Sequence, residues 1–329
     1  MTAFASRYQV QTSGNGSPRF PFVKRRIEGN VQILVYHRVN DEHDPFFPAV
    51  PVRVFAQQME YVASHRHVCS LDEAVARLKS RDVPDGTVVV TFDDGYCDNY
   101  AQAFPILRQH NIPATIFLAT NCIGTGNVLW HDRLFSAFRK TNAKILSGFH
   151  SEVGVCPIEA LDQKLDAMWK VIRVLRRMDD STRDQWLDSL SNCLNVQDKA
   201  VDNALMLSWD QIKVMAHHGI LFGAHTANHP ILSRLDPQKA REEILSSSHA
   251  IESRLGVAPK TFAYPNGLRD DFNGTTKSIL QEVGFDCAVT SIFGTNDSRQ
   301  DLFELRRGQP WEEHLPTFAA KLSWYRMAS

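Results

Sequence analysis

The sequence lacks several features that would each assign it to a specialised class of protein. It has only 6 cysteines, and none of them stands in a Cys-x-x-Cys pair, which argues against a zinc knuckle or a thioredoxin-like motif. No apolar run approaches the length of a membrane-spanning helix, and residues 1–26 contain no apolar core of a signal peptide. We therefore expect a cytoplasmic protein without a transmembrane segment, whose scattered cysteines are thiols in a reducing compartment.

An excess of charge of one sign is also missing. The chain has 36 Lys and Arg residues against 37 Asp and Glu residues, a formal net charge of −1. Without a basic field there is no global attraction to nucleic acid or to an anionic membrane, and we expect no nucleic-acid partner. The hydrophobic share of 43% and the length of 329 residues are typical of a globular protein with two domains, or of one α/β barrel with an insertion.

Apolar strands alternate with amphipathic helices over most of the chain. This alternation predicts parallel strands that are buried on both faces. The predicted fold class is α/β, a distorted (β/α) barrel of about seven parallel strands with a mainly helical insertion, and a doubly wound open sheet is the alternative. Strands are expected at 31–36, 87–92, 114–119, 219–224, 260–264, 285–290 and 303–306, and helices at 51–64, 71–79, 99–110, 208–218, 237–255, 276–283 and 315–325.

The alternation is interrupted between residues 124 and 205. Long helical patterns, notably at 161–178 and 182–194, occupy this stretch, and no comparable strand is seen in it. The sequence therefore predicts three parts. They are a flexible N-terminal tail (1–30), a barrel formed by 31–123 together with 206–329, and a helical insertion (124–205) that lies over the barrel rim.

Residues able to bind a metal stand where the predicted strands end, which is where α/β barrels gather their reactive residues. His37 follows the first strand, Asp93 and Asp94 follow the second, and His225 and His229 follow the strand at 219–224. Two histidines and one aspartate, with water completing the shell, are typical of a hydrolytic metal site. An Asp-Asp-Gly segment is also ordinary turn chemistry, so the residue types alone leave a turn and a metal site open.

Four segments resemble motifs of the polysaccharide deacetylases, the NodB-homology family or family 4 carbohydrate esterases. Residues 91–95 (TFDDG) resemble the first motif, and 225–229 (HTANH) resemble the second, a His-Ser/Thr-x-x-His metal pair. Residues 262–267 (FAYPNG) resemble the third motif of the exopolysaccharide deacetylases, and 35–39 (VYHRV) resemble the opening strand of that subgroup, which includes the poly-β-1,6-N-acetylglucosamine deacetylases.

This resemblance implies a role for each matched residue. Asp93 would be the general base, and Asp94, His225 and His229 would bind one divalent metal. The metal would polarise the acetamide carbonyl and lower the pKa of the attacking water. The family commonly uses zinc, with cobalt or nickel as alternatives.

The sequence departs from the family pattern at the residue that orients the base and at the general acid. Ala263 stands where the third motif usually carries an arginine, and Arg306 or Arg307 could supply the guanidinium instead. We predict Arg306 for this role, with a surface arginine pair as the alternative. The usual Leu-x-His motif of the general acid is missing near the C-terminus, and we predict His37 as the acid, with a structural barrel histidine as the alternative.

Four residues are predicted to contact the substrate. Tyr264, Pro265 and Asn266 belong to the third motif, although Asn266 replaces the aromatic residue that often follows the proline. Trp130, at the start of the insertion, could stack on a sugar ring, and the alternative is a core residue that anchors the insertion. Trp169 lies in an amphipathic helix and is predicted to be a packing residue.

The sequence thus favours a metal-dependent hydrolase that removes N-acetyl groups from N-acetylated sugars in a polysaccharide, a lipid-linked glycan or a precursor. One alternative is a metal-dependent hydrolase of another amide or a cyclic imide, which a closed pocket would favour over a long open cleft. The other alternative is a non-catalytic glycan-binding or assembly protein. An unpaired base beside a metal site counts against it, since a pure binder has no need of one. The sequence does not predict the oligomeric state.

Overall fold

The computed structural model describes residues 29–196 and 205–327. Residues 1–28, which make up most of the expected N-terminal tail, and residues 197–204, at one end of the expected insertion, lie outside the described residues. Within the described part of the chain, no helix is long and apolar enough to cross a membrane.

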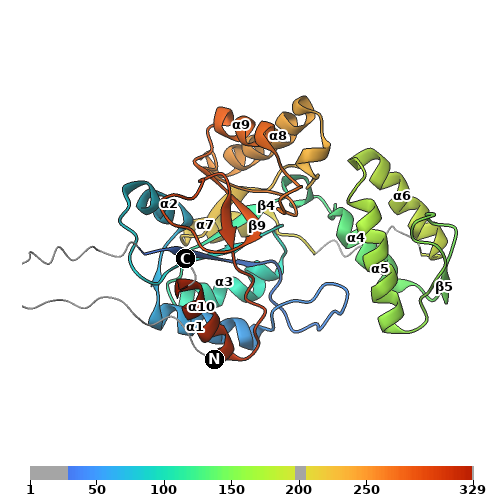
Figure 1. Ribbon diagram of the computed structural model, residues 1–329, viewed down its shortest axis with the longest axis horizontal. Helices are drawn as coiled ribbons and strands as arrows, with labels where there is room; N and C mark the ends of the chain where they lie inside the picture. The colour runs from blue at the N-terminus through green and yellow to red at the C-terminus, as the bar shows by residue number, and fades with distance from the viewer. Residues whose placement is uncertain (1–28, 197–204, 328–329) are drawn as a thin grey trace, which may run out of the picture.

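A parallel sheet forms the centre of the molecule (Figure 1). Its strands are β1 (Val31–Tyr36), β2 (His67–Val68), β3 (Thr87–Phe92), β4 (Ala114–Leu118), β7 (Leu221–Ala224), β8 (Thr261–Ala263), β9 (Cys287–Phe293) and β10 (Leu305–Arg307). The order across the sheet is β1-β3-β4-β7-β8-β9-β10, with β2 added beside β3, and each pair of neighbours is parallel.

The two ends of this sheet meet, which makes it a nearly closed barrel. The Gly308 N–H donates to the carbonyl oxygen of Ile33 at 2.8 Å, and the Val35 N–H donates to the carbonyl oxygen of Gly308 at 3.0 Å. The prediction of a barrel of about seven parallel strands is confirmed. The alternative, an open doubly wound sheet, is wrong.

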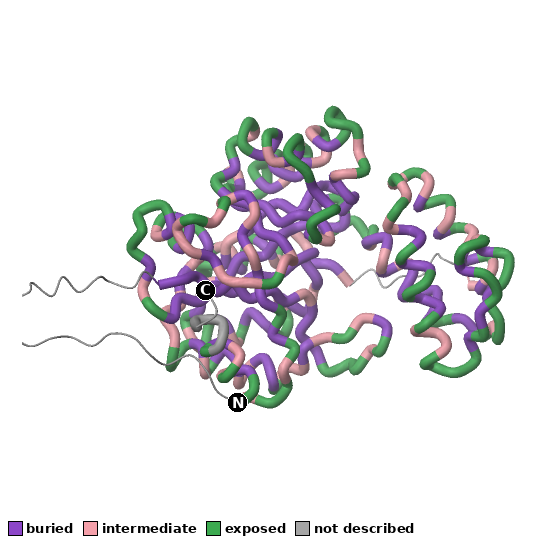
Figure 2. Tube along the Cα trace, in the orientation of Figure 1, coloured by how far each residue is buried: buried purple, intermediate pink, exposed green. Residues whose placement is uncertain are grey.

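Helices surround the barrel and bury one face each against it. Figure 2 shows the strands as buried and the outer faces of the helices as exposed. Ser70 and Ser208 cap the N-termini of two of the helices, accepting hydrogen bonds from the backbone N–H of Glu73 at 3.1 Å and of Gln211 at 3.2 Å. The helices are α1 (Val52–His65), α2 (Leu71–Ser80), a π-helical turn (Asn99–Ala103), α3 (Phe104–Gln109), α7 (Trp209–His217), α8 (Pro237–Leu255), α9 (Gly274–Val283) and α10 (Leu315–Met327).

The segment between β4 and α7 forms a helical unit beside the barrel, drawn in green in Figure 1. It consists of α4 (Trp130–Lys140), α5 (Leu161–Leu175) and α6 (Asp180–Cys193), with a short antiparallel pair of strands, β5 (Ile145–Leu146) and β6 (Cys156–Pro157). Its apolar faces form a hydrophobic cluster of their own, which Phe46 of the barrel's β1–α1 loop joins. The insertion therefore has its own core and a link to the barrel rim.

Candidate active site

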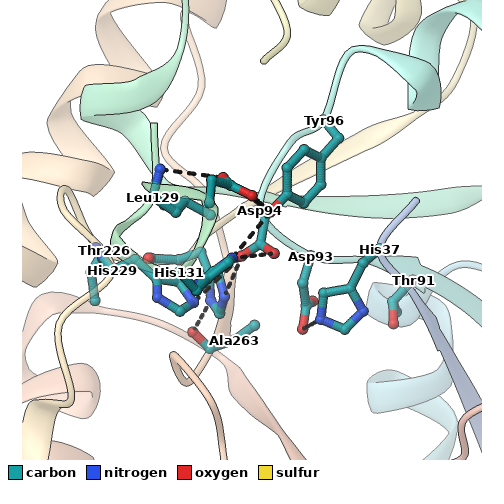
Figure 3. A network of polar contacts seen from close by, with 12 residues as sticks. His37, Thr91, Asp93, Asp94, Tyr96, Leu129, His131, Thr226, His229 and Ala263 are labelled. Carbon is teal, nitrogen blue, oxygen red and sulfur yellow. Dashed lines mark hydrogen bonds and ion pairs between the residues drawn. The ribbon is translucent and has the colours of Figure 1, made fainter. Parts of the chain in front are cut away.

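The carboxyl ends of three strands bring the predicted polar residues to one place (Figure 3). Tyr36, the last residue of β1, pairs with Phe92, the last residue of β3, so His37 and Asp93 leave the sheet side by side. On β7, Ala224 is the last residue, and His225 follows it directly. Because parallel strands end on the same rim of a barrel, residues far apart in the sequence share this site.

Asp94, His225 and His229 form a compact, buried group of three possible metal ligands. Oδ1 of Asp94 lies 3.4 Å from Nε2 of His225 and 3.4 Å from Nε2 of His229. One ligand atom from each residue lies within 4.8 Å of the others. Asp94 and His229 have φ angles of 75° and 59°, a conformation that non-glycine residues adopt mainly where function or packing requires it.

The polar atoms of this group fit a divalent cation. Oδ1 of Asp94 is buried without a hydrogen-bond partner, although buried carboxylate oxygens normally have one. Nδ1 of His225 lies 2.7 Å from the carbonyl oxygen of Ala263. A neutral imidazole that donates from Nδ1 keeps its Nε2 lone pair available, and here that atom faces Asp94. One carboxylate oxygen and two imidazole nitrogens are a donor set that zinc and similar ions accept.

Electrostatics keep the carboxyl groups of the site ionised. Burial on its own would raise the pKa of Asp94, but His225 and His229 outweigh it and hold this pKa below its usual value. Burial also opposes ionisation of Asp93, whose pKa is nevertheless lowered, mainly by Arg307. Burial lowers the pKa of His229 well below the ordinary value. An ionised carboxylate beside a neutral imidazole is the protonation state that metal binding requires.

Asp93 is held by a buried arginine through two hydrogen bonds. Nη1 of Arg307 donates to Oδ1 at 2.8 Å, and Nη2 donates to Oδ2 at 2.6 Å. The prediction of Arg306 for this role is therefore wrong, because adjacent strand residues point to opposite faces and the Arg306 side chain lies against Gly294. On the other side of the carboxylate, Nε2 of His37 lies 4.0 Å from Oδ2 of Asp93.

The third-motif segment supplies one pocket residue, where three were predicted. Tyr264 is fully buried, its hydroxyl donates to the carbonyl oxygen of Phe303 at 2.9 Å, and its ring stacks on Phe272. Pro265 is also buried and does not line the pocket. The structure thus corrects the predictions of Tyr264 and Pro265 as substrate contacts, because both residues are buried and neither lines the pocket. Asn266 does line the pocket, and its Nδ2 has no hydrogen-bond partner.

A pocket of about 190 Å³ lies over these strand ends. Its floor includes His37, Asp93, Asp94, His225 and His229, and Asn266 and Ser291 lie at its side. The remaining lining residues are Phe47 of the β1–α1 loop and, from the insertion, Trp130, His131, Phe135, Trp169, Ile172 and Arg176.

Both tryptophans line the pocket, but the structure changes the roles expected of them. Trp130, expected to stack on a sugar, is only 6% exposed and packs in the core of the insertion. The guanidinium of Arg183 lies over its ring, 4.9 Å from the centroid. Trp169, expected to be a packing residue, lines the pocket and is 56% exposed. Of these two tryptophans, Trp169 therefore offers a ligand the more exposed ring.

His131 of α4 is a site residue that the sequence analysis did not select. Its Nε2 lies 3.1 Å from the hydroxyl oxygen of Tyr96 and 4.0 Å from Oδ2 of Asp94 (Figure 3). The same hydroxyl donates to Asp132 at 3.1 Å. The sequence offers one signal for it, an imidazole between an indole and a carboxylate at 130–132. Only the docking of α4 on the rim brings that imidazole to the metal ligands.

Comparisons with known proteins agree with this geometry. A family model described as "Polysaccharide deacetylase" matches residues 80–288. The Bacillus subtilis protein YxkH, itself named for this family, is 20% identical over 300 residues, which cover 91% of this chain and 77% of YxkH. The poly-β-1,6-N-acetyl-D-glucosamine N-deacetylase of Staphylococcus epidermidis is 24% identical over 218 residues, which cover 61% of this chain and 69% of that protein.

A solved structure has the same fold. The deacetylase PplD of Streptococcus pyogenes, in complex with acetate, superposes with a TM-score of 0.61 at 20% sequence identity. The alignment covers 91% of this chain and 99% of PplD. The likeness therefore extends over both the barrel and the region of the insertion.

Proposed function

Because the chain belongs to the polysaccharide deacetylase family, we propose that it is a metal-dependent hydrolase that removes N-acetyl groups from N-acetylated sugars. The glycan would be a polysaccharide, a lipid-linked glycan or a precursor of one. The observation that carries this proposal is the buried group of Asp94, His225 and His229, directly beside an ionised Asp93. A pure glycan-binding protein would have no use for a base in that position.

Asp94, His225 and His229 would hold one divalent metal. We propose zinc, which readily takes imidazole and carboxylate ligands, with cobalt or nickel as alternatives. When bound, the metal would act as a Lewis acid on the acetamide carbonyl and would favour ionisation of the attacking water.

Asp93 is the residue best placed to take a proton from that water. Its carboxylate is ionised, and the paired hydrogen bonds from Arg307 fix its orientation. His37 lines the same pocket, with Nε2 4.0 Å from Asp93, and burial lowers its pKa, so its imidazole starts neutral. The proton that Asp93 takes from water would pass to this imidazole, which would then give it to the departing sugar nitrogen. The amide C–N bond then breaks, the acetyl group leaves as acetate with the oxygen of water, and the sugar keeps a free amine.

Acetate release tests this proposal directly. The purified full-length protein, loaded with zinc, should release acetate and free amine in equal amounts from oligomers of N-acetylglucosamine with β-1,4 or β-1,6 linkages. Removal of the metal with a chelator should abolish the release, and added zinc should restore it. If metal-loaded protein released no acetate from either oligomer, the proposed function would be wrong.

A matched pair of arginine variants tests how Asp93 is positioned. We expect Arg307→Lys to bind metal normally and to lose up to about 100-fold in kcat, because an ammonium group cannot form the paired hydrogen bonds that orient the carboxylate. Arg306→Lys changes the neighbouring residue in the same way and should keep nearly wild-type kcat. The measurement is acetate release at known metal content, with a melting curve for each variant. Equal kcat in the two variants would contradict the assignment of Arg307.

The cytoplasmic location stays a proposal as well. It would place the enzyme among the biosynthetic steps that build a glycan before export. Cell fractionation with antibody detection checks it, and recovery of the protein mainly from the medium or the cell envelope would contradict it.

A further inference from the structure

The loop that carries the two histidines of the metal group has an unusual backbone conformation. Thr226 and His229 have φ angles of 65° and 59°, both in the left-handed region, and Thr226 is β-branched. A positive φ is a genuine outlier for a β-branched residue, and such a conformation persists only where the surrounding structure holds it. The contacts that hold residues 226–229 therefore help to determine where His229 lies.

The two histidine rings are held in different ways. Nδ1 of His225 lies 2.7 Å from the carbonyl oxygen of Ala263, so a hydrogen bond to the neighbouring strand can fix this ring. Nδ1 of His229 is buried and has no hydrogen-bond partner among the described residues. The second ring nitrogen of a metal-binding histidine is usually fixed by an acceptor behind it. Without one, the His229 ring, whose Nε2 faces Asp94 (Figure 3), depends more strongly on the backbone of its loop.

A carboxylate of α8 holds this backbone. Oε2 of Glu243 accepts from the backbone N–H of Ala227 at 3.0 Å and from that of Asn228 at 2.9 Å. Oε1 of the same carboxylate accepts from Nδ2 of Asn228 at 2.6 Å. Successive backbone N–H groups that converge in a turn form a concavity suited to an anion, and here a side chain of the protein supplies that anion. Glu243 is half-buried, so its charge is screened less by salt than an exposed charge would be.

The segment after β4 holds the other side of the loop. The backbone N–H of Asn121 donates to the carbonyl oxygen of Ala227 at 2.9 Å, and its Nδ2 donates to Oδ1 of Asn228 at 2.8 Å. These contacts use acceptor atoms of the loop, whereas Glu243 accepts from its N–H groups. Loss of the carboxylate would therefore leave two backbone N–H groups beside the metal group without their acceptor.

We propose that Glu243 is a positioning residue of the metal centre, whose carboxylate holds the loop so that Nε2 of His229 faces Asp94. Glu243 belongs neither to the metal group nor to the lining of the catalytic pocket, so it would act through the loop. The inference rests on the metal centre of the proposed function. It assigns a role in metal binding to a residue that lies in none of the four sequence motifs.

Metal affinity, measured without any assay of activity, tests the role of Glu243. The purified full-length protein is stripped of metal and titrated with zinc in competition with a chromophoric chelator. We expect Glu243→Ala to bind zinc about 10–100-fold more weakly, the usual effect of changing a residue behind a metal ligand. Glu242→Ala is the matched control and should keep wild-type affinity, because Glu242 is exposed and accepts from Nε2 of Gln238 at 2.9 Å instead. Equal affinity in the two variants would overturn the proposal.

Cobalt separates positioning from a contribution to stability. The absorption spectrum of bound Co²⁺ reports the ligands and their geometry, which a lower melting temperature alone does not change. We expect Glu243→Ala to change this spectrum, and Glu243→Gln, which keeps one acceptor oxygen, to change it less. A wild-type spectrum in the folded Glu243→Ala variant would show that the carboxylate only stabilises the loop, and the proposal would be wrong.

Asn228→Ala keeps the test decisive if Glu243→Ala does not fold. Asn228 is exposed, and this change removes its side-chain hydrogen bond to Glu243 without altering α8. We expect weaker zinc binding than in the wild type, and unchanged affinity would then contradict the proposal. Wild-type protein that bound no zinc would contradict the proposed function itself. Equally tight binding by the wild type and these variants would overturn only the role of Glu243.

Discussion

Asp93→Asn is expected to keep its metal and to lose about 10²–10⁴-fold in turnover, the usual contribution of a general base. The amide is nearly isosteric with the carboxylate, so the fold and the three metal ligands should survive the change. The proton acceptor is lost, because an amide cannot take a proton from water at neutral pH. The measurement is acetate release against metal content for the same preparation.

A second buried aspartate provides the control for this variant. Asp98 lies near Asp93 in the sequence and also pairs with an arginine, its Oδ2 accepting from Nε of Arg38 at 2.9 Å. It belongs neither to the metal group nor to the pocket lining. Asp98→Asn should therefore cost stability but leave most of the turnover. Full activity of Asp93→Asn with metal bound would show that another group, with His37 the nearest candidate, accepts the proton. Loss of metal would instead make Asp93 a ligand.

His225→Ala is expected to weaken metal binding by more than about 100-fold, since even changes to residues behind the ligands commonly cost 10–100-fold. The variant would leave two protein ligands, Asp94 and His229, where the site offers three. Metal content by elemental analysis, and competition with a chromophoric chelator, measure the effect without any assay of activity.

His37→Ala is the companion variant, because it separates metal binding from catalysis. His37 lines the same pocket but is not one of the three grouped ligands. This variant should bind metal normally and lose turnover. If single alanine variants of Asp94, His225 and His229 all retained the wild-type metal stoichiometry, the proposed metal centre would be wrong.

Local sequence patterns determined the barrel and the principal site residues. The runs at 31–36 and 87–92 are mainly apolar, with Gln32, Thr87 and Thr91 as their polar residues, and they form strands that are buried on both faces. Parallel strands place their carboxyl ends on one rim, which is why Asp93, Asp94 and His225 could be grouped before any contact was known. A role that follows from a residue's place directly after a strand can be predicted without knowing how the side chains pack.

The choice between Arg306 and Arg307 needed the tertiary structure. Leu305 and Arg307 are buried and Arg306 between them is only half-buried, so the side chains alternate along β10 in the ordinary way. The strand was expected at 303–306, whereas β10 runs from Leu305 to Arg307. Sequence patterns place such strand ends poorly, and only the structure shows that Arg307 is the arginine that faces Asp93.

The roles of Trp130 and Trp169 in the insertion also could not be predicted from the sequence, because they depend on contacts between segments far apart in the chain. Trp130 and Trp169 both lie on amphipathic helices, and the sequence indicates only that such helices bury one face. Which partner covers that face depends on how α4 and α5 pack together and dock on the barrel, through contacts such as Arg176 with Asp271. By itself the sequence determined the barrel and its catalytic rim, because both follow from local patterns and strand direction. The shape of the pocket was decided only in the tertiary structure, because its walls come from segments that meet through long-range contacts.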